Sequence, residues 1–87
     1  MSENNVLSEL LKEGLEYHKN NKFIEALEIY KKILIEDSDH FETNFYMGSF
    51  LMHFKDRFAD ANKYIEKALV IAPANKEALA LHQKLKL

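Results

Sequence analysis

The 87-residue sequence repeats itself at a shift of 34 positions. That shift pairs Gly14 with Gly48, and these are the only two glycines in the chain. A glycine inside a helix costs roughly 1 kcal/mol relative to alanine, so two at matched positions predict places where helices cross closely. Further along each repeat the better shift is 35, which pairs Ala26 with Ala61. We therefore expect one inserted residue in the turn near Lys55, because surface turns accommodate insertions most easily.

Apolar residues recur every three or four positions along most of the chain, which is the spacing of an amphipathic helix. With two glycines and one proline, the sequence has few of the residues that form the tight turns between short strands. It has no cysteine, so it forms no disulfide. We expect an all-α fold of five helices joined by short turns, so that successive helices are antiparallel neighbours. The expected helices cover about residues 5–19, 23–34, 41–54, 58–72 and 76–87.

Local signals predict how these helices begin and end. The polar turn 36–40 can supply the cap of the next helix, and Asn75 can cap the last one. Pro73 is expected to end the fourth helix. The helix expected over 41–54 carries apolar residues on nearly every side, which predicts that it is enclosed by several neighbours.

This unit of about 34 residues, with a glycine midway along its first helix and an alanine early in its second, resembles the tetratricopeptide repeat. The resemblance implies one domain over residues 1–87, with repeat one over about 7–40, repeat two over about 41–75 and a closing helix over about 76–87. The positions that would hold the repeats together are Gly14, Ala26, Gly48, Ala61, Ala68 and Pro73. The sequence departs from the family pattern at Glu13, Ile33, Ser38 and Asn44.

In that family the first helices of successive repeats line a concave groove that holds a partner's peptide or helix. If Leu10, Gly14 and Tyr17 face the second helix of their own repeat, the residues one position later face the groove. An alternative is that Leu11, Leu15 and Phe45 simply pack against each other across adjacent helices, and both can hold at once. The groove residues expected on this basis are Leu11, Leu15, His18, Lys19, Phe45, Ser49, Met52, His53 and Lys84.

Several functional classes are disfavoured by the sequence. A formal net charge of -2 lacks the positive footprint of a nucleic-acid binder, and no apolar run is long enough to span a membrane. We expect a cytoplasmic protein, because the first five residues carry neither a positive cluster nor an apolar run typical of a signal peptide. There is no glycine-rich phosphate loop and no recognisable nucleophile arrangement, so we expect no enzyme and no cofactor.

Two specific sites known in other proteins are also disfavoured. His18 and His53 have no obvious third ligand, so we expect no metal site. Tetratricopeptide repeats that clamp the acidic tails of heat-shock chaperones use Lys and Asn at positions where this chain has Leu11 and Leu15. A further clamp asparagine is replaced by Tyr46. The donors for two-carboxylate recognition are therefore missing.

The resulting expectation is a non-catalytic scaffold or adaptor that binds a protein or peptide. One alternative is a small homo-oligomerisation or assembly domain, because repeat arrays usually need about three units for stability. The helix over 41–54 has more large apolar residues than one buried face requires. Phe50 and Phe54 could therefore mark a contact on the convex face or edge in such an assembly. Another alternative is an accessory fragment of a larger protein.

Overall fold

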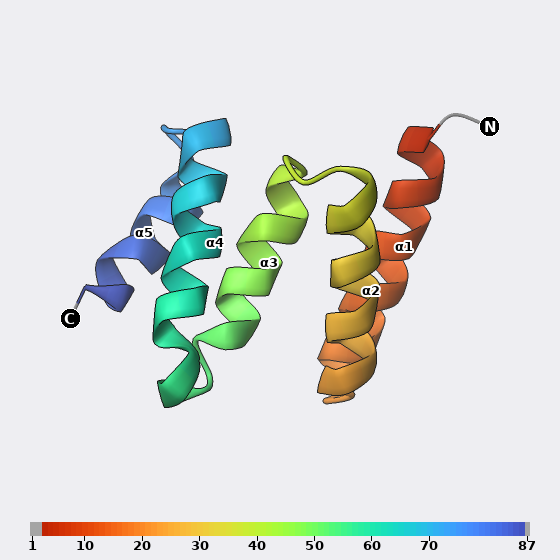
Figure 1. The fold of residues 1–87 in the computed structure, drawn as a ribbon, viewed down its shortest axis with the longest axis horizontal. Coiled ribbons are helices and arrows are strands. Elements are labelled where there is room, and N and C mark those ends of the chain that lie inside the picture. The colour runs from red at the N-terminus through yellow and green to blue at the C-terminus, as the bar shows by residue number, and fades with distance from the viewer. Residues whose placement is uncertain (1–2, 87) are drawn as a thin grey trace. The chain divides into compact units, whose positions relative to one another are not determined.

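A computed structural model describes residues 3–86 (Figure 1). These residues form five α-helices and no strand, which confirms the predicted all-α class. The chain divides into two compact units, Met1–Ser38 and Asp39–Leu87, and each is described by itself. Met1, Ser2 and Leu87, which the expected domain and closing helix included, lie outside the described residues.

The first unit is one antiparallel hairpin of α1 (Glu3–Lys19) and α2 (Phe23–Glu36). Its turn has Asn21 at φ 62°, a left-handed conformation that asparagine tolerates better than most residues. The amide of Lys22 donates to the Tyr17 carbonyl at 2.8 Å, and the amide of Asn21 donates to the His18 carbonyl at 3.1 Å. These two bonds satisfy carbonyls at the end of α1 and reverse the chain within three residues.

Gly14 lies where α1 crosses α2 most tightly. A methyl group added there would lie 2.8 Å from Tyr30 Cε1 and 3.1 Å from Ile29 Cγ2. Ala26 on α2 is fully buried. The close crossing predicted at Gly14 is thus confirmed. Around it lies a core cluster of buried and half-buried side chains: Leu7, Ile29, Ile33, Leu10, Leu11 and Tyr17.

The second unit contains α3 (Phe41–Leu51), a 3-10 turn (Lys55–Arg57), α4 (Phe58–Ile71) and α5 (Lys76–Leu85). Helix α4 packs against both α3 and α5 (Figure 1). A methyl group added to Gly48 would lie 2.5 Å from Ile65 Cδ1 and 3.1 Å from the Ala61 carbonyl oxygen, so the second close crossing is also confirmed. Ala61 and Ala68, the small residues expected on α4, are fully buried.

Helix α3 is shorter than predicted, because it ends at Leu51 rather than near Phe54. The backbone of Phe54 is extended, and its ring lies 5.5 Å from the ring of Phe50, centroid to centroid. The chain therefore leaves the helix axis before Phe54. The turn near Lys55, where one inserted residue was expected, contains the 3-10 helix that the turn of the first hairpin does not have.

Phe50 corrects a second expectation. The sequence suggested that Phe50 lies outside the buried face of its helix, but only 4% of its surface is exposed. Phe50 is therefore a core residue of the second unit, whereas Phe54 is 39% exposed. Thr43, Asn44, Met47 and Leu51 are also buried, but Phe41, Phe45 and Tyr46 are only half-buried. Within the second unit α3 packs mainly against α4, so the predicted enclosure by several neighbours is only partly present.

Helix ends follow the local signals closely. The Asn75 side chain accepts a hydrogen bond from the Ala78 amide at 3.0 Å, which is the predicted cap of α5. His40, from the turn expected to cap the next helix, accepts from the Thr43 amide through Nδ1 at 3.3 Å. Helix α4 ends at Ile71, two residues before Pro73.

Candidate interaction surfaces

The groove residues predicted on α1 are only partly exposed. Leu11 and Leu15 are half-buried, and Leu11 packs against the core cluster of its own hairpin. Leu11 therefore contributes to the core of its own hairpin. Lys19, the last residue of α1, is exposed.

His18 faces the second helix of its own hairpin. Its Nδ1 lies 3.2 Å from the hydroxyl oxygen of Tyr30. Its ring meets the edge of Phe23 at a centroid distance of 5.8 Å. This aromatic cluster positions the end of α1 against α2, so His18 has a structural role within its own hairpin.

The groove residues predicted in the second unit follow α3 and continue into the turn after it. Phe45 and Ser49 lie on α3 and are half-buried, and Met52 is the half-buried residue that ends the helix. His53 lies in the exposed turn, and Lys84 is exposed on the last turn of α5.

Phe45 lines a small pocket of about 180 Å³ between α3 and the start of α5. The pocket joins the first helix of the second hairpin, which carries the predicted groove residue Phe45, to the start of the last helix. Its lining combines three aromatic rings, two carboxylates and one amide, contributed by Phe41, Phe45, Tyr46, Glu42, Glu77 and Asn75. We call it the aromatic pocket.

The three rings of the aromatic pocket form one continuous platform. Phe41 and Phe45 are stacked, with centroids 6.1 Å apart and an interplanar angle of 22°. Phe45 meets Tyr46 edge to face at 5.4 Å and 78°. Both arrangements are favourable for aromatic pairs. All three rings remain half-buried rather than covered, so the pocket presents ring surface to a ligand.

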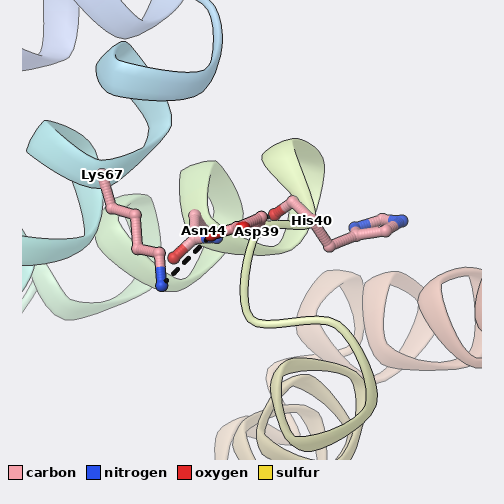
Figure 2. A network of polar contacts seen from close by, with 4 residues as sticks. All are labelled: Asp39, His40, Asn44 and Lys67. Carbon is pink, nitrogen blue, oxygen red and sulfur yellow. Dashed lines mark hydrogen bonds and ion pairs between the residues drawn. The ribbon is translucent and has the colours of Figure 1, made fainter.

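A polar network secures the start of α3, where Phe41 and Glu42 of the aromatic pocket also lie. Figure 2 shows four residues of this network. Asn44 is almost fully buried, and its Nδ2 donates to the His40 carbonyl at 2.9 Å. Lys67 on α4 pairs with Asp39 at 3.5 Å. The His40 ring points away from Lys67 and lies 2.9 Å from the Thr43 hydroxyl. The network fixes the first turn of α3 and hence the backbone that carries Phe41 and Phe45.

A second and larger pocket, of about 480 Å³, lies on the first hairpin between the start of α1 and the end of α2. Its apolar lining includes Val6 and Ile35, which are 50% and 81% exposed. Lys32, Glu36 and Asp37 border it with charge. We call it the hairpin-end pocket. It offers an apolar surface that the first unit leaves uncovered.

Sequence reasoning identified only Phe45 among the residues of the aromatic pocket. Phe41 and Tyr46 were assigned to the general crowding of one helix, and Glu42 and Glu77 were not singled out. A usable signal exists, because Phe41 and Phe45 are four residues apart and so share a helix face. The start of α5 could not be placed beside them from spacing alone.

The part of the chain that is described contains neither a cluster of metal ligands nor a membrane-spanning helix. Within residues 3–86 no three His, Cys, Asp or Glu side chains gather as metal ligands would. None of the helices in that range combines the length and apolar character needed to cross a bilayer. Buried side-chain nitrogen and oxygen atoms of the described residues all have hydrogen-bond partners.

Comparisons with known proteins do not assign the chain to a group. No protein-family model matches the sequence. No curated protein matches it either.

Proposed function

We propose that this chain is a non-catalytic protein-protein interaction module, a scaffold or adaptor built from two tetratricopeptide-like hairpins and a closing helix. It binds a peptide or helix of a partner protein on the surface formed by α3 and α5. The observation that carries the proposal is the aromatic pocket, which presents three half-buried rings around Phe45. Tyrosine and other aromatic side chains are enriched in protein interfaces.

The repeat assignment within this proposal is supported by the two hairpins. Both place their only glycine against a buried residue of the second helix, Tyr30 in one hairpin and Ile65 in the other. Leu11 and Leu15 occupy the sequence positions that match Phe45 and Ser49 at the shift of 34. The first helix of each repeat thus carries related positions, although Leu11 also packs into its own core.

The proposal includes a partner that is a protein and is neither nucleic acid nor membrane. The formal net charge of -2 gives no positive footprint for phosphate backbones. It also includes a cytoplasmic location, which the cysteine-free composition permits. We propose no enzymatic activity and no cofactor, and a chaperone-tail partner is disfavoured because hydrophobic Leu11 and Leu15 replace the expected polar donors.

A peptide library displayed on phage, selected against the immobilised wild-type chain, tests the function. The best selected peptide is then measured by fluorescence anisotropy against Phe45→Glu and Met52→Glu variants. We expect Phe45→Glu to weaken binding at least about 100-fold, which is the effect of a central interface residue. Val70→Glu is the matched control, because Val70 is 81% exposed on α4 and lines neither pocket. Equal binding by the wild type and Phe45→Glu, with helical circular dichroism retained, would refute this surface.

Homo-oligomerisation is a second candidate, favoured by the hairpin-end pocket with its exposed Val6 and Ile35. Burial of this apolar lining against another copy would remove it from water. Light scattering on the wild type and an Ile35→Glu variant tests this candidate. A concentration-dependent dimer that Ile35→Glu abolishes would support it, and a strict monomer at high concentration would exclude it.

A further inference from the structure

The aromatic pocket combines two features that together favour a cation. Aromatic ring faces carry negative charge density and attract ammonium and guanidinium groups. Glu42 and Glu77 add two carboxylates to the same lining. Both carboxylates are exposed, and neither forms an ion pair with another residue in the range 3–86.

The placement of the two carboxylates is matched. Glu42 is the second residue of α3, and Glu77 is the second residue of α5. Acidic residues in a first helical turn stabilise their own helix, so this placement has a purely structural explanation as well. The helix starts do not cancel the charge of the carboxylates, because each helix start contributes roughly +0.5 charge and each carboxylate carries a full negative charge. The pocket keeps a net negative character of about one charge.

No lysine, arginine or histidine is among the described residues that line the pocket. Lys76 precedes Glu77 in α5, but it is not among the lining residues. Lys67, the lysine of the polar network, is paired with Asp39. The described lining therefore holds no basic side chain that would neutralise Glu42 and Glu77.

We propose that the aromatic pocket binds a lysine or arginine side chain of a partner peptide, held over the rings of Phe45 and Tyr46 and paired with Glu42 and Glu77. A volume of about 180 Å³ suits one long basic side chain rather than a folded ligand. The side-chain oxygen of Asn75 accepts the capping hydrogen bond at the start of α5. This bond holds the Asn75 side chain in place at the edge of the pocket. This inference rests on the proposed protein-binding function, since it names the chemistry that one part of the binding surface recognises.

Nuclear magnetic resonance titrations of the whole chain with blocked single amino acids test the inference directly. The probes are the acetylated amides of arginine, lysine, citrulline and glutamate. Citrulline has nearly the shape of arginine without its charge. We expect arginine or lysine to shift the backbone amides of residues 41–46 and 75–77, and citrulline to bind at least about fivefold more weakly.

The Glu42→Gln/Glu77→Gln variant should bind the basic probe about tenfold more weakly than the wild type. Its control is Glu25→Gln/Asp60→Asn, which removes acidic residues from the first turns of α2 and α4 but leaves the pocket lining intact. Phe45→Leu keeps an apolar side chain and removes one ring, so it should weaken binding about threefold. Circular dichroism verifies that each variant remains helical.

Citrulline binding as strong as arginine, stronger binding of glutamate, or no shift at residues 41–46 with any basic probe would each overturn the inference. These failures are separate from failure of the proposed function. If a selected peptide still depends on Phe45 but tolerates replacement of its basic residues by citrulline, the protein-binding function stands and the cation site does not. If selected peptides bind independently of Phe45, the proposed function itself fails.

Discussion

The first hairpin, α1 with α2, and the second, α3 with α4, place a glycine at the same repeat position but oppose it with different atoms. Gly14 faces the edge of the buried Tyr30 ring and a methyl group of Ile29. Gly48 faces two atoms of Ile65 and the backbone oxygen of Ala61. An added methyl would lie 2.5 Å from the nearest atom at Gly48 and 2.8 Å from the nearest atom at Gly14. The same sequence signal therefore marks two crossings, of which the one in the second hairpin is tighter.

The two hairpins also differ at the position that precedes each glycine by four. The first hairpin has Leu10 there, which packs on an apolar cluster. The second has Asn44, buried and bonded to the His40 carbonyl. In the second hairpin a buried polar side chain thus holds the start of α3 by a hydrogen bond. The same helix start contributes residues to the aromatic pocket. The tighter glycine crossing, the hydrogen-bonded helix start and the proposed binding surface therefore all lie in the second unit.

Alanine substitution of the two glycines gives the largest expected difference between the hairpins. Overpacking typically costs 1–3 kcal/mol, offset by a gain of roughly 1 kcal/mol from the better helix propensity of alanine. We expect Gly48→Ala to lower the free energy of unfolding by about 2 kcal/mol, and Gly14→Ala by about 1 kcal/mol or less. Urea denaturation followed by circular dichroism measures both.

The Ile65→Val background sharpens this prediction, because valine lacks the Cδ1 atom that lies 2.5 Å from the added methyl. The cost of Gly48→Ala should be smaller in that background than in the wild type. Equal costs for the two glycine substitutions would show that the crossings are equivalent after all.

Replacement of Asn44 by alanine tests the polar start of α3. The substitution removes the donor to the His40 carbonyl and leaves a gap in a buried site, so we expect a loss of about 1.5 kcal/mol in the free energy of unfolding. Asn44→Leu, which copies the residue of the first hairpin, should not restore stability, because the carbonyl stays without that donor. A fully stable Asn44→Leu variant would mean that the network contributes nothing specific.

The cap of α5 is expected to have a smaller effect. Asn75→Ala removes the acceptor of the Ala78 amide and should cost about 1 kcal/mol. Asn75→Ser, which keeps a capping oxygen, should recover most of the loss. Hydrogen exchange at the first amides of α5 measures the local opening, and protection unchanged in the alanine variant would contradict the assigned cap.

The ion pair between Asp39 and Lys67 is expected to have the smallest effect. Both side chains are substantially exposed, 75% for Asp39 and 43% for Lys67, so water and salt screen their attraction. Asp39→Asn should change the free energy of unfolding by about 0.3 kcal/mol, and the change should vanish at high salt. A loss above about 1 kcal/mol that persists in high salt would show that Asp39 has a further structural role.

Sequence patterns predicted those parts of the fold that depend on local chemistry. The close crossings at Gly14 and Gly48 and the cap at Asn75 follow from properties of single residues in a helix. The end of α3 did not follow, because Phe54 and Phe50 fit a helical stripe equally well. The extended backbone of Phe54, at φ -121° and ψ 114°, shows that the chain has left the helix that ends at Leu51.

The candidate site was predictable only in part, for a similar reason. Phe45 follows from its register beside Gly48, since a helix position fixes the face on which a residue lies. Glu42 and Glu77 are 35 residues apart and have ordinary roles at helix starts. Their meeting in one pocket depends on how α5 packs on α4 beside α3, which no spacing within a helix encodes.

Mapping of a bound peptide on the chain tests the central claim most directly. A peptide selected on the wild type is titrated into isotopically labelled protein, and the backbone amide shifts are followed. The account predicts that the largest shifts fall at residues 41–46 and 75–77, around the aromatic pocket. Shifts confined to the outer surface of α4 around Val70, with residues 41–46 unaffected, would contradict it.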